Sequence, residues 1–416
     1  MNIKSLLLGS AAALVAVSGA RAADAVVMAE PEPVDYVRVC DVYGAGFYYI
    51  PGTETCLQIS GYVRFKIAAA SDVDNEEGDD YQAGSNVRVR LNFDAREETE
   101  LGTLRAFARV QSTNSFQQGG TDTDDTYEMD MGYIQLGGLT MGYLDTLWTE
   151  GDGFQTDTDL PVGDFETNRV SYTFAVAGFT AAISAEEDGT GDAIPDVVAR
   201  LGYEGGWGGF YIAGSYDETV VLGDDEDGFP VFATGTNFGL FPYDLVDDSE
   251  DDGAFAIKGA VSLKDLLVAN SELKFEGSYA FDPSRYSTLQ IFDNVNTVGD
   301  DVNNFGGTIP VEWQVGAGYS QSFGKLGVAV AGVYGQTFDL GAFGTLDDGT
   351  VGIVNVGDAE YYRLVANVGY EITKNFSVLG ELSYANLDLS DSDAAFAGGD
   401  DEIDQTTGFV QFVRSF

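Results

Sequence analysis

The most constraining feature of this sequence is an alternation of apolar and polar residues with a period of two, which recurs from Leu57 to the C-terminus. Near the C-terminus one face of such a segment carries Tyr362, Leu364, Ala366, Val368 and Tyr370, and the other carries Arg363, Val365, Asn367, Gly369 and Glu371. Successive side chains of a β-strand point to opposite faces, so this period indicates strands. Aromatic residues stand at both ends of the apolar faces, as in the girdles of membrane barrels.

Strands are expected at sixteen places, which are 57–69, 86–97, 103–112, 128–136, 138–143, 168–174, 179–186, 196–204, 208–216, 253–262, 271–280, 313–323, 326–338, 359–371, 376–388 and 406–416. Sixteen is an even number, as in the closed barrels of bacterial outer membranes. All nine prolines lie outside these segments, and proline cannot donate to a strand ladder. The predicted fold is all-β, a 16-stranded antiparallel transmembrane β-barrel.

The connections between these segments alternate in length, which supports the same fold. Short turns at 137–138, 177–178, 324–325 and 373–375 alternate with long connections at 70–85, 113–127, 144–167, 187–195, 217–252, 281–312, 339–358 and 389–405. Outer-membrane barrels have short periplasmic turns and long external loops. A soluble β-sandwich has no reason to show this regularity.

The N-terminus is predicted to be a targeting segment. Residues 1–22 have a cationic start at Lys4, an apolar run from Leu6 to about Val17, and small residues at Ala20 and Ala22. This pattern is typical of a secretory signal peptide, cleaved before Ala23, although a buried N-terminal helix is the alternative. The predicted organisation is a signal peptide at 1–22, an N-terminal segment at 23–56 and the barrel at 57–416.

Two cysteines are present, Cys40 and Cys56. In an exported protein they are expected to form a disulfide. The alternative, a redox site, has no CxxC spacing and no nearby His or Lys in the sequence to lower a thiol pKa.

The chain is strongly acidic, with 20 Lys and Arg against 68 Asp and Glu and a net charge of −48. This charge excludes nucleic acid as a partner, because phosphates would be repelled. The absence of His excludes Ser-His-Asp, Cys-His and HExxH chemistry, so no enzyme activity is predicted. A hydrophobic content of 44% is too high for a disordered chain.

Most of the acidic residues lie in the long connections, where Arg285 is the single base. The acidic tracts 72–78, 224–228 and 247–253 do not match the spacing of a calcium-binding loop. They are interpreted either as solvated loops or as diffuse binders of Ca²⁺ or Mg²⁺ that bridge the loops to lipopolysaccharide. No specific metal site and no cofactor are predicted.

The N-terminal block resembles a known family. The stretches YVRVCDVYG from Tyr36, YIPGTETC from Tyr49 and SGYVR from Ser60 are similar to the mature N-terminus of alphaproteobacterial general porins of the rhizobial and Brucella type. The resemblance implies a homotrimer of 16-stranded barrels whose third external loop folds into the lumen. The terminal Phe416, with Phe412 and Val410 on its face of the last strand, resembles the signal read by the outer-membrane assembly machinery, although Arg414 interrupts that face.

A cluster of basic residues is predicted on the lumen face. If the apolar residues of the first three strands face lipid, the lumen receives Arg64, Lys66, Arg88, Arg90, Arg105 and Arg109. The third external loop, 144–167, carries Asp145, Glu150, Asp152, Asp157, Asp159, Asp164 and Glu166 and no base. If this loop folds inward, acids and bases face each other across an aperture whose field sets selectivity. The alternatives are that nearby acids neutralise the basic wall and that the loop lies outside.

The predicted function is passive diffusion of small hydrophilic solutes and ions across the outer membrane, because a sixteen-stranded barrel leaves a water-filled channel. Two alternatives stay open, a solute-specific channel and a structural or adhesive barrel with a sealed lumen. Trp148 beside the third loop is the one sign of a solute-specific channel. The acidic mouth and the basic wall together favour a weak preference for cations.

Overall fold

The computed structural model describes residues 38–71, 82–114, 126–189, 193–218, 223–224, 230–231, 241–242, 253–266, 268–292, 308–345, 351–389 and 402–416. The predicted signal peptide at 1–22 lies outside these residues, and the division at 22 and 56 stays a prediction. The acidic tracts also lie outside them, apart from Asp224 and Gly253. Of the long connections, 144–167 is described throughout.

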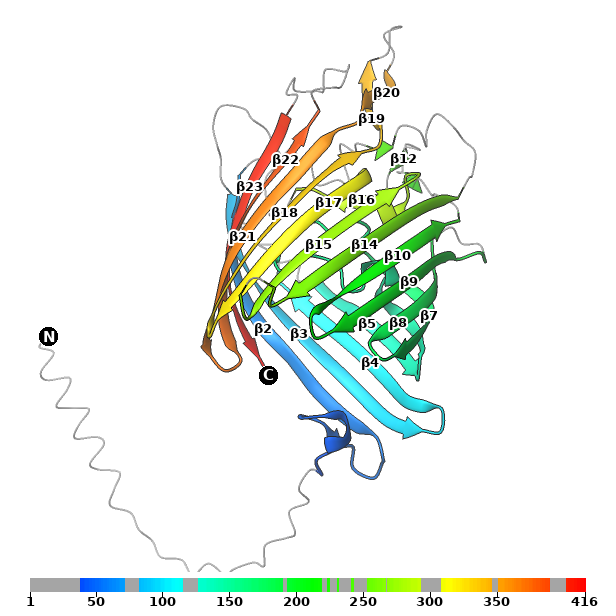
Figure 1. Cartoon of the computed structure of the whole chain (residues 1–416), viewed down its shortest axis with the longest axis vertical. Coiled ribbons are helices and arrows are strands. Elements are labelled where there is room, and N and C mark those ends of the chain that lie inside the picture. Colours follow the sequence, from blue (N-terminus) through cyan, green and yellow to red (C-terminus); the bar gives the residue numbers. More distant parts are fainter. Residues whose placement is uncertain are drawn as a thin grey trace, which may run out of the picture. The chain divides into compact units, whose positions relative to one another are not determined.

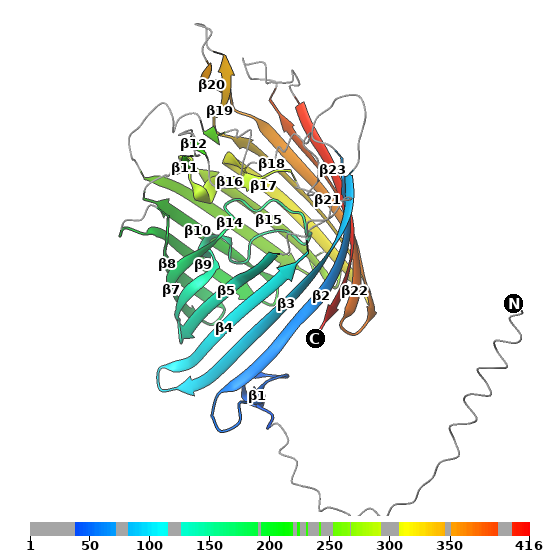
Figure 2. The same cartoon turned by 180° about the vertical axis from the view of Figure 1, so that it is seen from behind.

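Sixteen long antiparallel strands close into a barrel in the described part of the chain (Figures 1 and 2). They are β2 (Cys56–Ala70), β3 (Gln82–Thr99), β4 (Gly102–Thr113), β5 (Thr126–Leu136), β6 (Leu139–Asp145), β7 (Glu166–Val176), β8 (Phe179–Glu186), β9 (Asp196–Gly205), β10 (Gly208–Asp217), β14 (Ala254–Lys264), β15 (Ser271–Ala280), β17 (Thr308–Phe323), β18 (Leu326–Thr337), β21 (Glu360–Thr373), β22 (Phe376–Asp388) and β23 (Glu402–Ser415). Each pairs with the next, and β23 pairs with β2 to close the barrel. The predicted fold is confirmed.

Short elements occupy several connections that were expected to be irregular. They are β1 (Tyr48–Tyr49), β11 (Gly223–Asp224), β12 (Pro230–Val231), β13 (Phe241–Pro242), β16 (Thr288–Gln290), β19 (Leu340–Thr345), β20 (Val351–Gly357) and the 3-10 turns η1 (Asp41–Tyr43), η2 (Leu147–Thr149) and η3 (Arg285–Ser287). Among the described residues, no helix is long and apolar enough to cross a membrane.

The expectation that every proline lies outside the strands is wrong at three positions. Pro230 and Pro242 lie in the short strands β12 and β13, and Pro310 lies near the start of β17. Pro310 pairs with Thr288 of β16, whereas β17 begins its ladder with β18 only at Val311 and with β15 at Trp313. The proline is thus tolerated because it stands beyond the barrel ladder, at the beginning of its strand.

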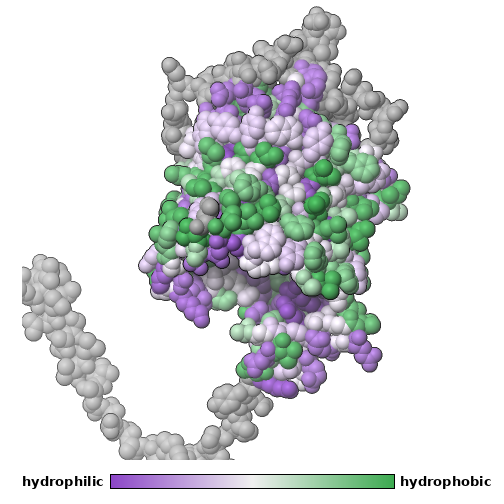
Figure 3. Space-filling model, viewed as in Figure 1, coloured by the Kyte–Doolittle hydropathy of each residue, from purple (hydrophilic) through white to green (hydrophobic). Residues whose placement is uncertain are grey.

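The two faces of the strands differ as the alternation predicts. Outward side chains such as Ile59, Val63, Leu364 and Leu382 are 42–67% exposed, and Figure 3 shows hydrophobic residues gathered across the middle of the face in view. Aromatic side chains lie near both edges of the strands. Phe179, Tyr203, Trp207 and Phe210 group at the end with short turns (the turn end), and Trp313, Tyr334, Tyr362 and Tyr384 pair near the opposite end (the loop end). This arrangement fits an apolar belt between aromatic girdles.

The turn between β7 and β8 shows how the sequence sets the hairpins. Ala177 has φ 51° and Gly178 has φ 84°, as a two-residue hairpin of type I′ requires. A Cβ on Gly178 would lie 2.4 Å from the carbonyl oxygen of Glu204. Gly178 is therefore required both by the positive φ of the turn and by the close approach of Glu204 on β9.

The predicted disulfide is present. Cys40 and Cys56 are bonded, with 6.0 Å between their Cα atoms, and both are buried with Phe47. The bond fastens the segment that contains η1 and β1 to the first residue of β2. At the other end of the barrel sequence, the backbone N–H and C=O of Phe416 both bond to Gly61, at 3.0 and 3.1 Å. These bonds extend the β2–β23 ladder to the last residue.

Candidate functional site

All six predicted basic residues lie on the inner face of β2, β3 and β4, and we call this set the basic wall. Arg64 pairs directly with Arg88, and Arg90 with Gln111. The six side chains are partly buried, whereas the alternate residues, such as Val63 and Val110, are exposed on the outside. The alternation therefore placed these residues correctly relative to one another.

Two aspartates on the same wall neutralise much of this charge. Asp94 on β3 accepts bidentate hydrogen bonds from Arg105, at 2.9 and 2.8 Å, and from Arg96, at 2.9 and 2.7 Å. Asp130 on β5 accepts from Arg90 at 3.2 Å and from Arg109 at 3.1 Å. The alternative that nearby acids neutralise the basic wall thus describes Arg90, Arg105 and Arg109. An acid on an adjacent strand is nearer than one across the lumen.

The guanidinium groups nevertheless remain closer to water than their partners. The side chains of Asp94 and Asp130 are 8% and 10% exposed, whereas those of Arg90, Arg96, Arg105 and Arg109 are 23–28% exposed. The carboxylates therefore lie behind the guanidinium groups and hold them in fixed orientations. The surface of the wall is still lined by N–H donors.

The third loop is slightly shorter than predicted and spans 146–165. Asp145 is the last residue of β6 and pairs with Glu166, the first residue of β7. These two acids therefore belong to the strands and not to the loop. Glu150 and Asp164 are exposed on the loop, and no hydrogen bond or ion pair of theirs is among the interactions described.

The loop begins at a buried anchor. Glu186 on β8 is fully buried and accepts hydrogen bonds from the backbone N–H of Leu147 at 2.9 Å and from the Tyr286 hydroxyl at 3.2 Å. Thr146 caps the turn η2 by accepting from the N–H of Trp148. Trp148 is also fully buried and donates its indole N–H to the carbonyl of Val162 at 2.8 Å. Trp148 therefore joins the two ends of the loop and does not line the channel. Its position no longer favours a solute-specific channel.

The middle of the loop is held by lysines from β14 and β15. Lys258 pairs with Asp152 and donates to the carbonyl of Val162 at 2.7 Å. Lys274 donates to the carbonyls of Gly151, at 2.9 Å, and Gly153. Burial acts to raise the pKa of Asp152, but the adjacent Lys258 ammonium outweighs burial, so this pKa lies below its usual value. Asp152 thus serves to fasten the loop, and its charge is not presented to the basic wall.

The tip of the loop meets β21 and β22. The carboxylate of Glu381 accepts from the backbone N–H groups of Asp157 and Thr158, both at 2.8 Å, and from the Thr158 hydroxyl at 2.7 Å. Arg363 donates to the carbonyl of Thr158 at 3.0 Å. The backbone N–H groups of Asp157 and Thr158 therefore have a hydrogen-bond partner on β22, and the carbonyl of Thr158 has one on β21.

One acid of the loop does reach the basic wall. The Asp157 carboxylate lies 3.7 Å from the Lys66 ammonium, and its side chain is 39% exposed. Asp159 instead turns back to accept from the N–H of Phe154 within the loop. Burial raises the pKa of the Asp159 carboxyl to about 6. Asp157 is therefore the acid of the loop that contacts the basic wall, at Lys66.

Glycines on β17 give the loop room. A Cβ on Gly316 would lie 2.5 Å from the ring of Phe154, and one on Gly318 would lie 2.8 Å from the Gln155 side chain. Both distances are too short for real Cβ atoms. The loop can approach this part of the barrel only because these positions have no side chain.

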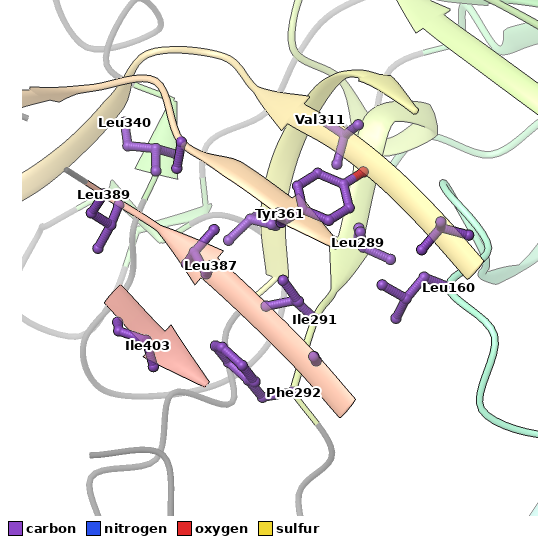
Figure 4. Close-up of a cluster of buried hydrophobic side chains, with 14 of the residues drawn as sticks. Leu160, Leu289, Ile291, Phe292, Val311, Leu340, Tyr361, Leu387, Leu389 and Ile403 are labelled. Carbon is purple, nitrogen blue, oxygen red and sulfur yellow. The ribbon is translucent and has the colours of Figure 1, made fainter. Parts of the chain in front are cut away.

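An apolar cluster packs the second half of the loop against the barrel. Leu160 and Val162, each 3% exposed, contact a group from β16–β23 that includes Leu289, Ile291, Val311, Tyr361, Leu387 and Ile403 (Figure 4). Fully burying a side chain of this size contributes about 1.5–3 kcal/mol. The loop is therefore fixed by hydrophobic packing as well as by hydrogen bonds.

Sequence reasoning missed most of the residues that hold the loop. Glu381 and Arg363 were assigned to the polar face of their strands, but the alternation does not say which residue a polar side chain meets. Lys258 and Lys274 likewise alternate with the outward Ile257 and Phe275, but the alternation does not show that they meet the loop. Among the described residues, no group of three or more His, Cys, Asp or Glu side chains is arranged to hold a metal ion.

Comparisons with known proteins agree with this architecture. A family model described as "Porin subfamily" matches residues 24–409. Porin Omp2b of Brucella canis (strain ATCC 23365 / NCTC 10854 / RM-666) is 43% identical over 245 residues, which cover 53% of this chain and 67% of that protein. Among solved structures, the outer membrane channel DcaP of Acinetobacter baumannii has a TM-score of 0.57 at 14% identity, covering 88% of this chain and 99% of that chain. OmpT of Vibrio cholerae in its trimer form has a TM-score of 0.50 at 10% identity, covering 88% and 100%.

Proposed function

This chain belongs to the porin subfamily and is a passive channel of the bacterial outer membrane, and on that premise we propose how its lumen is arranged. In our proposal, small hydrophilic solutes and ions pass between the third loop and the arginines of the basic wall, and the contact of the loop tip with Lys66 bounds this passage on one side. The observation that carries the proposal is the fastening of the loop to β14 and β15, far from the basic wall in the barrel order, and to β21 and β22, which approach the wall through β23.

The same contacts support the inward position of the loop. Strands β14–β22 are separated from β2–β4 by several strands in one direction around the barrel. The loop leaves β6 and bonds to Lys258 of β14 and Lys274 of β15, which lie beyond β7–β10 in the barrel order, and these contacts support a path through the space that the strands enclose. Its tip then meets Glu381 of β22 and Lys66 of β2, which are separated by β23 alone. Such a path narrows the passage and places Asp157 beside the basic wall.

The electrostatics of this aperture differ from a simple ring of opposed charges. Asp94 and Asp130 compensate four arginines locally, and Asp157 with Lys66 adds one pair at the edge of the aperture, where the loop meets β2. Rings of charged side chains set selectivity in such pores. We propose that the guanidinium surface acts on solutes at short range, while the acidic loop end draws cations toward the mouth.

We also propose that the protein is a homotrimer in contact with outer-membrane lipid and lipopolysaccharide. The trimer form of the structurally similar OmpT supports the first part. The exposed apolar band supports the contact with lipid, and the acidic external connections support a contact with lipopolysaccharide through divalent cations.

Conductance in planar bilayers tests the proposal. We expect stepwise currents in KCl, and a shift of the reversal potential toward cation preference in Arg88→Glu and Arg109→Glu. A folded barrel without currents would instead support a sealed structural or adhesive barrel. Currents with an unchanged reversal potential in both variants would contradict the placement of the aperture at the basic wall.

A further inference from the structure

Two aromatic rings lie on the basic wall with no apolar cluster to cover them. Phe107 on β4 and Tyr133 on β5 stack with their centroids 5.1 Å apart and their planes at 26°. Both are partly exposed on the inner face, and neither belongs to the three buried apolar clusters of the described residues. A stacked pair of rings on a wetted wall is not explained by packing of the barrel.

Guanidinium groups flank these rings along the strand. The Arg105 guanidinium lies 5.0 Å from the centroid of Phe107 and 5.3 Å from that of Tyr133. The Arg109 guanidinium lies 5.8 Å from Phe107 on the other side. At these distances each guanidinium is attracted to the face of the ring that it lies over. The two rings are therefore bracketed by positive charge.

The flanking arginines are held in place from behind. Arg105 uses Nε and Nη2 on Asp94, and Arg109 uses Nη1 on Asp130 and Nε on Asn92. A guanidinium has five N–H donors, so each retains donors beyond these bonds. Because Asp94 and Asp130 are more buried than the arginines, a solute in the lumen meets the guanidinium groups first.

The alternation of arginine and aromatic ring continues on both sides. Arg90 lies 5.5 Å from the ring of Tyr62, further into the barrel. Arg96 lies 5.1 Å from the ring of Phe47 and 5.7 Å from that of Tyr43, at the turn end. The stripe thus runs along the wall from the level of Tyr62 to the turn end of the barrel.

We propose that Arg105, Phe107, Arg109 and Tyr133 form a weak binding subsite for aromatic carboxylates that pass through the channel. The carboxylate accepts hydrogen bonds from Arg105 or Arg109, and the ring of the solute stacks on Phe107 and Tyr133. An inorganic anion would use only the first contact and a neutral ring only the second. This inference rests on the proposed function, since it names a solute class for the same lumen.

Partial block of the channel by benzoate tests the subsite. Benzoate added to one side is expected to reduce the KCl current at lower concentration than cyclohexanecarboxylate, which has the same charge and a ring without π electrons. Phe107→Leu should raise the half-blocking concentration of benzoate about 2- to 12-fold, since an aromatic pair contributes about 0.5–1.5 kcal/mol. Phe93→Leu is the matched control, because Phe93 lies on the outer face of the same wall and is 37% exposed.

Equal block by the two carboxylates, or equal block of the wild type and Phe107→Leu, would overturn the inference. A KCl current in the same experiment would still support the proposed channel function. Saturation-transfer NMR on the detergent-folded protein measures benzoate contact without any current. A benzoate signal that Phe107→Leu weakens and Phe93→Leu does not is expected there. If the barrel does not conduct, the proposed function fails, and this NMR signal still decides the subsite.

Discussion

The carboxylate of Glu381 on β22 accepts a hydrogen bond of 2.8 Å from the backbone N–H of Asp157, 224 residues earlier in the chain. The side chain of the same Asp157 lies 3.7 Å from Lys66 on β2. One residue of the loop tip is therefore held through its backbone by one part of the barrel and reaches the basic wall with its side chain. The width of the proposed aperture depends on this bond.

Glu381→Gln is expected to loosen the loop tip. Glutamine keeps one acceptor oxygen but loses the negative charge, so the bonds from Asp157 and Thr158 should weaken by about 1–3 kcal/mol. We expect larger fluctuations of the open-channel current and an unchanged fold by circular dichroism. Glu204→Gln is the control, since the Glu204 side chain is 80% exposed and pairs with Lys264 away from the loop. Identical current noise in the two variants would contradict the role given to Glu381.

Gly316→Ala is expected to displace the loop. The added Cβ would lie 2.5 Å from the Phe154 ring, and overpacking of this kind costs about 1–3 kcal/mol. The melting temperature should fall and the single-channel conductance should change. Gly327→Ala provides the comparison, because a Cβ at Gly327 on the neighbouring strand β18 has nothing within 4 Å. Matching melting curves and conductances for the two proteins would show that the loop does not rest on Gly316.

Reduction of the Cys40–Cys56 bond should affect the N-terminal segment and spare the channel. The bond restrains a loop of about 15 residues, which corresponds to about 3 kcal/mol on the loop-entropy model. Proteolysis should then cut between residues 40 and 56, while the conductance stays the same. Loss of the current on reduction would contradict this expectation. It would mean that the segment between Cys40 and Cys56, which precedes β2, contributes to the pore.

The packing of the third loop should depend on pH through Asp159. Burial raises the pKa of this carboxyl from 3.8 to about 6, and the Asp152 charge adds to the effect while Lys274 opposes it. An acid whose pKa is higher in the folded state stabilises that state fully below about pH 4 and loses this contribution as the pH rises through about 6. The channel should therefore be quieter at about pH 4 than at about pH 7.

Asp159→Asn provides the control for this pH effect. The amide cannot ionise but keeps an acceptor for the N–H of Phe154. We expect the variant to show the quiet current at both pH values. A variant whose noise follows pH as the wild type does would show that other groups control the loop.

The strands could be predicted closely because their signal is local. For β8, β15 and β22 the expected bounds coincide with the observed ones, since alternation and short turns fix both ends. The start of β17 at Pro310 could not be predicted in this way. It depends on pairing with β16, and no pattern in either segment predicts that pairing. The basic wall was also predictable, since the period of two assigns Arg88 and Arg109 to one face without further information.

The partners of the site could not be predicted in the same way. The alternation gives the face of Glu381, but its contact with Asp157 depends on the path of the loop between β6 and β7, which no local pattern sets. Trp148 was the one sign of a solute-specific channel, yet it is buried against Tyr286, which is distant in sequence, and bonded to Val162 at the other end of the same loop. Residues that meet through the lumen share no local pattern, so only the three-dimensional structure brings them together.

Thiol modification at Lys66 tests the central claim, that ions pass between the third loop and the arginines of the basic wall, beside the contact of Asp157 with Lys66. The two native cysteines are bonded to each other, so Lys66→Cys introduces a single free thiol beside Asp157. We predict that a bulky methanethiosulfonate reagent lowers the single-channel conductance of Lys66→Cys in a step, while Lys264→Cys, near a turn of the barrel, keeps its conductance after the same treatment. An unchanged conductance of fully modified Lys66→Cys, or an equal fall in both proteins, would contradict the claim.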